Sequence, residues 1–311
     1  MTVLVTGGTG FVAGWTIAEL LRQGHDVRTT IRSRRPDVPG DYEVVKADLT
    51  SDEGWAEAMA GVRYVLHVAS PLSGDGDLVG PARDGTLRVL RAAVDAGVER
   101  VVLTSSAAAA TPAPGSTGVF DETLWTDLEV QPFDEYRRSK VLAERAAWEF
   151  MRDKDTALVT VLPGAVLGPT LSQENLGSVR VVGRLLDGMP GTPRVGLNIV
   201  DVRDVADLHI RAMTAPEAAG ERFIAVSEFM WMADVARTLR QHFGERASRV
   251  PRRTLPDFLL KALSLVVKEI RPLVPMLGRQ YTLSHEKASR VLGWQPRPAV
   301  TAIVDCAESL L

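Results

Sequence analysis

A tyrosine and a lysine one helical turn apart, together with a serine at the end of a strand, could carry out acid–base chemistry. Tyr136 and Lys140 are spaced i and i+4, so on a helix their side chains share a face, with Cβ atoms about 5–6 Å apart. An ammonium group there favours tyrosinate, and we expect it to lower the pKa of Tyr136 from its usual value of about 10. Hydride reduction of a carbonyl creates an alkoxide that must be stabilised and protonated. A phenol as acid, the Ser106 hydroxyl as hydrogen-bond donor and a nearby cation are the groups that this reaction requires.

A Tyr-x-x-x-Lys spacing also occurs by chance on many helices, but a glycine-rich turn at the start of the chain suggests a hydride donor. The aliphatic run Val3–Val5 predicts a buried parallel strand, and Gly8-Thr9-Gly10-Phe11-Val12-Ala13 follows it in the pattern G-x-G-x-x-G/A. Gly7 permits a tight turn, Gly10 lets the backbone approach a pyrophosphate, and the helix that follows presents free N–H groups to the phosphates. The segment predicts a dinucleotide-binding turn; the alternative is a tight strand-to-helix turn without a ligand.

The second predicted strand indicates which dinucleotide would bind. A helix closed by Gly24 leads into the strand Val27–Ile31, which completes a βαβ unit. A free ribose 2′-hydroxyl usually requires Asp or Glu at the end of this strand. Here the strand ends in Ile31-Arg32-Ser33-Arg34-Arg35. We therefore predict NADP(H), with Arg32 as a bidentate partner of the 2′-phosphate and the next two arginines in an exposed loop.

Two further strands are expected to end at the same edge of the sheet. The run 42–47 ends in Asp48-Leu49, and the run 63–68 continues into Ala69-Ser70-Pro71. In a doubly wound fold, ligands bind at this carboxyl edge. Asp48 is therefore a candidate to face the adenine, the alternative being a polar strand end. His67 is expected to be a packed core histidine rather than a metal ligand, because no other ligand stands at metal spacing.

Composition excludes several classes of protein. The chain has 311 residues, 45% of them hydrophobic, and a net charge of −3. It can bury one α/β domain with an appended lobe, and no nucleic-acid or membrane partner is expected. Its one cysteine, Cys306, cannot form an internal disulfide, and the chain begins in a core strand rather than a leader, so a cytoplasmic location is expected. No metal is expected, because the histidines are scattered.

These segments together resemble the extended short-chain dehydrogenase/reductases, in the dihydroflavonol-reductase-like and aldehyde-reductase branch. The likeness covers almost the whole chain and is carried by residues 6–12, 104–106, 121–127, 136–140, 163–169, 200–208 and 287–296. It implies an α/β fold with a doubly wound, mostly parallel Rossmann sheet and a smaller C-terminal substrate-binding lobe. We expect residues 1–165 to form the dinucleotide-binding core, with 195–226 returning to it, and residues 166–194 and 227–311 to form the lobe.

The resemblance also implies roles for individual residues. Tyr136 would be the acid, Lys140 would bind the ribose and tune the tyrosine, and Ser106 would orient the substrate oxygen. The expected cofactor-binding residues are Gly7, Thr9, Gly10, Phe11, Val12, Arg32, Asp48, Leu49, Ala69, Lys140, Pro163 and Val166, and the expected substrate-binding residues are Ser70, Pro71, Ser106 and Tyr136. The chain departs from the family at Leu162, where members of this branch often have Asn before Pro-Gly.

The sequence therefore predicts an NADPH-dependent oxidoreductase that reduces an aldehyde or ketone, or oxidises the corresponding alcohol. One alternative is a nucleotide-sugar epimerase or dehydratase, but such relatives usually show Arg-x-x-Asn-x-Tyr-Gly-Pro after the sixth strand, and residues 161–169 lack that Asn and Tyr. Another alternative is an NADP(H)-sensing regulator without chemistry, although such proteins tend to lose the Tyr or the Lys. An apolar helix face that includes Val89 and Ala93 is expected to pack either on the sheet or on a second subunit, and the second alternative would give a homodimer.

Overall fold

A seven-stranded parallel sheet forms the centre of the computed structural model, which describes residues 1–71, 78–131, 133–172 and 177–311. Within these residues the strand order is β10-β7-β5-β4-β1-β2-β3, and every neighbouring pair is parallel. The strands are β1 (Thr2–Val5), β2 (Asp26–Ile31), β3 (Glu43–Lys46), β4 (Tyr64–His67), β5 (Arg100–Thr104), β7 (Ala157–Pro163) and β10 (Arg222–Ala225). The order reverses between β1 and β4, and such a reversal is where ligands bind in doubly wound sheets.

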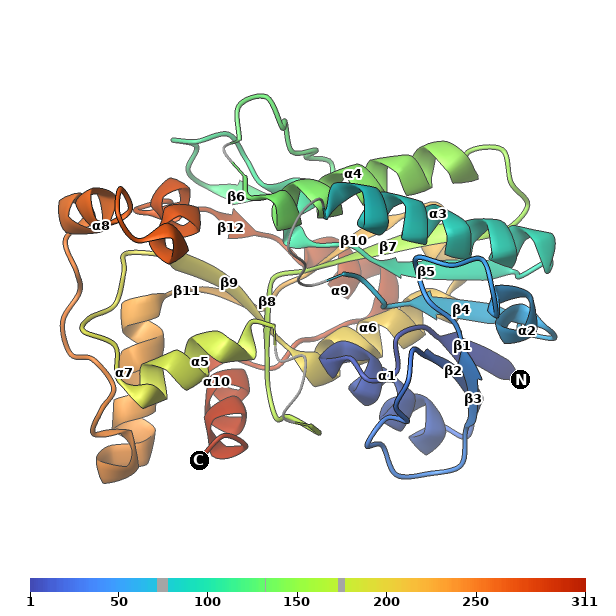
Figure 1. The fold of residues 1–311 in the computed structure, drawn as a ribbon, viewed down its shortest axis with the longest axis horizontal. Coiled ribbons are helices and arrows are strands. Elements are labelled where there is room, and N and C mark those ends of the chain that lie inside the picture. Colours follow the sequence, from blue (N-terminus) through green and yellow to red (C-terminus); the bar gives the residue numbers. More distant parts are fainter. Residues whose placement is uncertain (72–77, 132, 173–176) are drawn as a thin grey trace.

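Helices cover both faces of this sheet (Figure 1). They are α1 (Phe11–Arg22), α2 (Trp55–Met59), α3 (Val79–Asp95), α4 (Glu135–Met151) and α6 (Val202–Thr214). Helices α1 and α6 pack together on one face, where Ile17 and Leu208 are fully buried. Helices α3 and α4 pack together on the other face, where Leu90 and Met59 of α2 share a second apolar cluster. Because the strands covered by these helices are all parallel, their carboxyl ends lie at one edge of the sheet.

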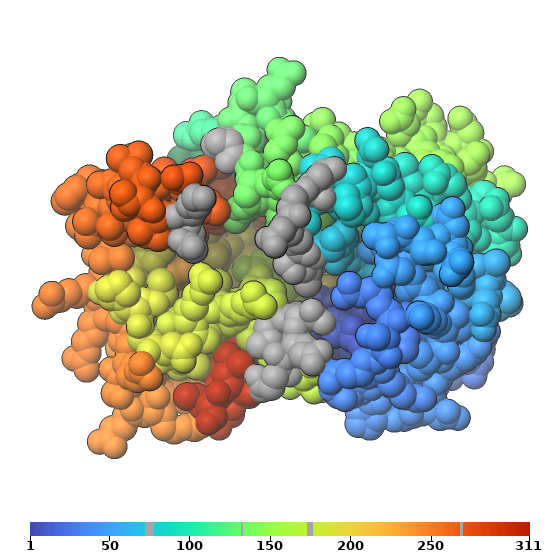
Figure 2. All heavy atoms as spheres, viewed as in Figure 1, coloured from blue at the N-terminus to red at the C-terminus, as the bar shows by residue number. Residues whose placement is uncertain are grey.

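Most of the rest of the chain builds a lobe beside the carboxyl edge of the sheet, drawn mainly in yellow-green, orange and red in Figures 1 and 2. A three-stranded sheet in the order β11-β9-β8 forms its centre, and a two-stranded sheet pairs β12 with β6. The strands are β6 (Val119–Phe120), β8 (Ala165–Leu167), β9 (Gly196–Asp201), β11 (Glu228–Trp231) and β12 (Thr282–Leu283), and the helices are α5 (Val179–Asp187), α7 (Met232–Phe243), α8 (Asp257–Leu263) and α10 (Ala299–Glu308). Helix α9 (Glu286–Leu292) instead packs against α6 and β10 of the main sheet, although residues 227–311 were expected to belong to the lobe. Of the segment 195–226, β9 lies in the lobe sheet, whereas α6 and β10 lie against or in the main sheet.

The predicted fold class is confirmed, and the predicted strands of the main sheet agree with the structure to within about two residues at each end. Gly24 adopts a positive φ of 79° after α1, as expected of a residue that ends a helix. Helix α2 has no side-chain cap, because its N-cap is Gly54, with φ of 82° and no side-chain hydrogen bond. A Cβ on Gly54 would stand 2.0 Å from the Lys46 carbonyl oxygen, so close approach to β3 demands glycine there.

No helix among the described residues combines the length and the apolar character needed to cross a bilayer. The apolar stretch 255–277 forms α8 and a 3-10 helix, Lys268–Met276, which contains Pro272 and Pro275.

Candidate active site

One cleft of about 550 Å³ opens at the carboxyl edge of the main sheet. It lies where the strand order reverses, and all residues predicted for catalysis, cofactor or substrate line it. These residues are Gly7, Thr9, Gly10, Phe11, Val12, Arg32, Asp48, Leu49, Ala69, Ser70, Pro71, Ser106, Tyr136, Lys140, Pro163 and Val166. They come from seven separate stretches of sequence, and the parallel sheet brings their strand ends together.

The glycine turn forms the floor of the cleft at β1. Gly7 has φ of 70°, and its N–H donates to the Thr30 hydroxyl at 3.0 Å. A Cβ on Gly7 would stand 2.9 Å from the Cβ of Ala69, so the turn passes directly beside the end of β4. Helix α1 begins after Gly10 without a side-chain cap. Its first-turn N–H groups therefore lack a side-chain acceptor and line the cleft, and this donor set fits a pyrophosphate.

The arginines after β2 have different environments. The Arg34 guanidinium pairs with Asp37 at 3.0 Å. The Arg35 guanidinium stacks 4.5 Å from the centre of the Tyr42 ring. Arg32 is exposed, lines the cleft and makes no hydrogen bond or ion pair within the described part of the chain. Its side chain is therefore available to a ligand phosphate.

The carboxylate of Asp48 lies at the end of β3 in the same cleft. Its Oδ1 accepts hydrogen bonds from the backbone N–H and the hydroxyl of Thr50, at 2.8 and 2.7 Å. These bonds lower the pKa of Asp48, with a smaller contribution from the positive charge of Arg32. Asp48 is therefore an ionised hydrogen-bond acceptor.

The three candidate catalytic side chains come from two elements. Asp134 caps α4 by accepting from the Arg137 N–H at 2.8 Å, which fixes Tyr136 in the first turn and Lys140 in the next. Ser106 follows β5 and caps a 3-10 helix, Ala107–Ala110. The Lys140 ammonium donates to the Thr104 carbonyl oxygen at 3.3 Å, which joins α4 to the end of β5. The Tyr136 hydroxyl makes no hydrogen bond to any described residue, so its proton is available to a ligand.

The expected lowering of the Tyr136 pKa is wrong. Burial raises the pKa of Tyr136, because removal of solvent disfavours the phenolate. Burial also lowers the pKa of Lys140 to about 8, and the Glu144 carboxylate partly opposes this. The sequence shows that Tyr136 and Lys140 share a face of a helix, but it does not show how deeply tertiary packing buries them.

His67 is a packed core residue, as predicted. The Thr6 hydroxyl accepts from the N–H groups of Val68 and Ala69, at 3.1 and 3.0 Å, so it donates its own proton to His67 Nδ1, 2.8 Å away. This leaves the imidazole neutral, with its proton on Nε2, and burial lowers the pKa of His67 to about 3. Within the described residues no cluster of His, Cys, Asp or Glu could hold a metal ion.

The buried, neutral His67 should make the protein sensitive to acid. Below about pH 6.5 the unfolded chain binds a proton that folded His67 does not bind until about pH 3, so the free energy of unfolding should fall by about 1.4 kcal/mol per pH unit across that window. Urea unfolding of the wild type and of His67→Asn at pH 7 and pH 5 measures this. The variant should lose about 2 kcal/mol less than the wild type over this range. Equal losses would contradict a neutral His67.

Several residues that line the cleft were not predicted from the sequence. Thr30 holds the glycine turn, and Trp55 lines the cleft while its indole donates to the Asp48 carbonyl oxygen at 3.0 Å. Gly177 and Ser178, before α5, line the lobe side. Only side-chain polarity at a strand end could have indicated Thr30. Leu162, where the family often has Asn, is fully buried in an apolar cluster. Gly164, two residues further along the chain, lines the cleft.

Comparison with known proteins agrees with this geometry. A model of the NAD dependent epimerase/dehydratase family matches residues 3–225. Cinnamoyl-CoA reductase 1 from Oryza sativa subsp. japonica is 37% identical over 256 residues, which cover 78% of this chain and 75% of the relative. An anthocyanidin reductase ((2S)-flavan-3-ol-forming) from Vitis vinifera is 33% identical over 278 residues, which cover 78% of this chain and 81% of the relative.

A solved structure is similar over the full length. The crystal structure of yeast methylglyoxal/isovaleraldehyde reductase Gre2 complexed with NADPH has a TM-score of 0.83 and 26% identity, and the match covers 100% of this chain and 98% of that one. The chain therefore belongs to the NAD dependent epimerase/dehydratase family and, within the extended short-chain dehydrogenase/reductases, to the branch of NAD(P)-dependent reductases that its sequence resembles.

Proposed function

We propose that the protein is an NADPH-dependent reductase of an aldehyde or ketone, with Ser106, Tyr136 and Lys140 as its catalytic set. The observation that carries the proposal is the single cleft that contains the glycine turn, the available guanidinium of Arg32 and the catalytic set. The similarity to a yeast methylglyoxal/isovaleraldehyde reductase complexed with NADPH supports both the substrate class and the cofactor.

The residues present fit an NADP(H) molecule along the cleft. The uncapped start of α1 would hold the pyrophosphate, Arg32 the 2′-phosphate and Asp48 with Leu49 the adenine end. Pro163 and Val166 would contact the nicotinamide and Lys140 the adjoining ribose. When bound, the cofactor supplies the hydride. The lobe formed by residues 166–194 and 227–311 would cover the substrate.

The proton chemistry belongs to the chain itself. Ser106 would donate a hydrogen bond to the substrate oxygen and hold it beside Tyr136. The raised pKa of Tyr136 keeps the phenol protonated at neutral pH, so it can give its proton to the forming alkoxide. Lys140 would stabilise the phenolate that remains, provided that it is itself protonated.

Carbonyl reduction should therefore weaken in alkaline solution. Lys140 is cationic below its pKa of about 8 and neutral above it, so kcat/KM for the carbonyl should be level in mild acid and should fall above about pH 8 by about tenfold per unit. Lys140→Arg is the matched control, because arginine stays charged over this range and should remove the alkaline fall. A wild-type profile that rises with pH would contradict this role of Lys140.

A substrate panel tests the proposed function. Loss of NADPH absorbance should occur with some members of a set of aromatic and aliphatic aldehydes, ketones and β-ketoesters, and mass spectrometry should identify the alcohol product. NADPH binding without turnover across the panel would favour a cofactor sensor. Conversion of a UDP- or dTDP-sugar without net cofactor consumption would favour an epimerase or dehydratase. The proposed compartment is the cytoplasm, in keeping with the single, buried Cys306.

A further inference from the structure

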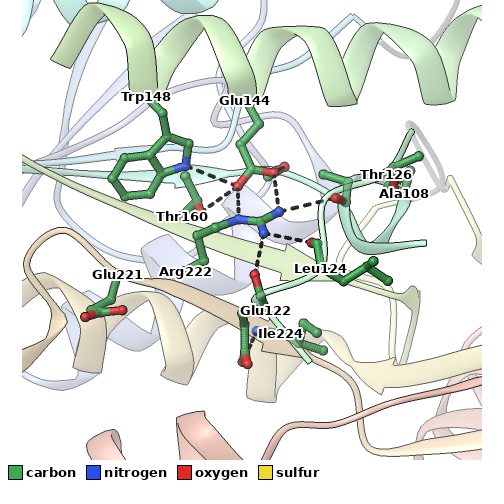
Figure 3. Close-up of polar contacts among 12 residues, drawn as sticks. Ala108, Glu122, Leu124, Thr126, Glu144, Trp148, Thr160, Glu221, Arg222 and Ile224 are labelled. Atoms are coloured by element: carbon green, nitrogen blue, oxygen red, sulfur yellow. Dashed lines mark hydrogen bonds and ion pairs between the residues drawn. The ribbon is translucent and has the colours of Figure 1, made fainter. Parts of the chain in front are cut away.

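A buried ion pair joins the helix of the catalytic set to the edge of the main sheet (Figure 3). Glu144 of α4 is 1% exposed and Arg222 of β10 is 7% exposed. Arg222 Nε donates to Glu144 Oε1 at 2.8 Å, and its Nη2 donates to Oε2 at 3.4 Å. Thr160 and Trp148 also donate to Oε1, at 2.8 and 3.3 Å. A buried pair with this many partners holds its elements in one arrangement.

Glu144 is also linked to the catalytic set in two ways, along α4 and through Ser105. It lies one helical turn beyond Lys140, as Lys140 lies one turn beyond Tyr136, so all three follow one face of α4. Its Oε2 accepts from the Ser105 hydroxyl at 2.5 Å. Ser105 directly precedes Ser106, and the carboxylate therefore joins α4 to the turn that carries the candidate hydrogen-bond donor.

Arg222 extends the same network to the segment 121–127, which the proposed function leaves unexplained. Its Nη1 donates to the carbonyl oxygens of Glu122 and Leu124, at 2.5 and 3.0 Å, and its guanidinium stacks 3.6 Å from the centre of the Trp125 ring. The next residue, Thr126, donates from its hydroxyl to the Ala108 carbonyl oxygen at 2.5 Å. The segment thus holds the 3-10 helix that Ser106 caps.

We propose that Glu144 is a positioning residue for the reaction proposed above: through Ser105 and Arg222 it holds the Ser106 turn against α4. Its negative charge, four residues further along the same helix, also favours the ammonium form of Lys140. The inference rests on the proposed function. The other ionisable groups around Lys140 are Tyr136 on its own helix and the neutral His67 on β4, so Glu144 is the negative charge that acts on it among the described residues.

Two substitutions at position 144 separate charge from position. Glu144→Gln keeps the shape of the side chain and removes its charge. The pH above which kcat/KM falls should therefore be lower than in the wild type by about 1 unit. Glu144→Asp keeps the charge and shortens the side chain, so it should leave that fall in place while it lowers kcat. A purely structural Glu144 would alter stability and total activity in both variants without moving the pH at which activity falls, and that result would overturn the charge role.

Ser105→Ala tests the positioning role with little disturbance of the buried pair. It removes the hydroxyl that joins Glu144 to the catalytic turn, so kcat should decrease by about threefold to tenfold. The pH above which kcat/KM falls should stay the same as in the wild type. Thermal unfolding should show a folded protein. A kcat equal to that of the wild type would overturn the positioning role.

Glu144→Gln leaves Arg222 buried without its partner and could prevent folding. The double variant Glu144→Gln, Arg222→Gln removes both charges. The pH above which kcat/KM falls should again be lower than in the wild type, because Glu144 is the charge that acts on Lys140. If kcat/KM of the folded double variant falls at the same pH as that of the wild type, the charge role is overturned. A wild type that reduces no carbonyl would instead reject the proposed function, so the two failures are distinguishable.

Discussion

Tyr136→Phe should lower kcat for carbonyl reduction by about 10²- to 10⁴-fold, which is the usual contribution of a positioned acid. Asp48 carries the one carboxyl group among the described residues that line the cleft, and its lowered pKa keeps it ionised. It lies at the proposed adenine end of the cleft, so it cannot replace the phenol. NADPH affinity should stay within about twofold of the wild type, because only the hydroxyl is removed. Steady-state rates and fluorescence titration with NADPH measure the two effects.

Tyr64→Phe is the matched control for this substitution. The Tyr64 phenol donates to Glu99 at 2.9 Å and lies at the amino end of β4, whereas the cleft opens at the carboxyl ends of the strands. This variant should keep the wild-type rate once it is shown to be folded. A Tyr136→Phe variant with unchanged kcat would reject the proposed acid and with it the mechanism.

Arg32→Ala should weaken NADPH binding by about 10- to 100-fold and leave NADH binding unchanged. A charge-assisted hydrogen bond contributes about 1.5–3 kcal/mol, which corresponds to this range. NADH carries no 2′-phosphate, so it cannot report the loss. Calorimetric titration with each cofactor at fixed ionic strength gives both dissociation constants.

The neighbouring Arg34 provides a control of equal charge. Arg34 pairs with Asp37, so Arg34→Ala should change NADPH affinity by less than about threefold. Equal losses of NADPH affinity in the two variants would point to a general electrostatic effect of the loop. Equal losses of NADPH and NADH affinity in Arg32→Ala would contradict a 2′-phosphate contact.

Local patterns predicted most of the main sheet and one wall of the cleft. A few adjacent residues largely decide backbone conformation and burial in the run Val3–Val5, in the glycine turn and at Gly24. The same holds for the shared helical face of Tyr136 and Lys140. Residues at the ends of separate strands could be assigned to one site because parallel strands end at one edge.

Features that depend on tertiary packing could not be predicted. The pKa of Tyr136 was expected to fall because its neighbour on the helix is cationic, yet burial decides the direction. The pair Glu144 and Arg222 is separated by 78 positions in the sequence, and no local pattern links the two. The position of β9 in the lobe sheet likewise depends on pairing with β8 and β11, which its sequence does not specify.

The fate of the hydride tests the proposed carbonyl reduction most directly. NADPH deuterated at the transferable nicotinamide position is incubated with an aldehyde or ketone that the enzyme accepts, and the product is examined by NMR and mass spectrometry. We expect one deuterium on the carbinol carbon of the alcohol, no deuterium there in reactions with Tyr136→Phe within the same time, and faster transfer from NADPH than from NADH. Deuterium that stays on the cofactor while substrate is converted would contradict the proposed reductase.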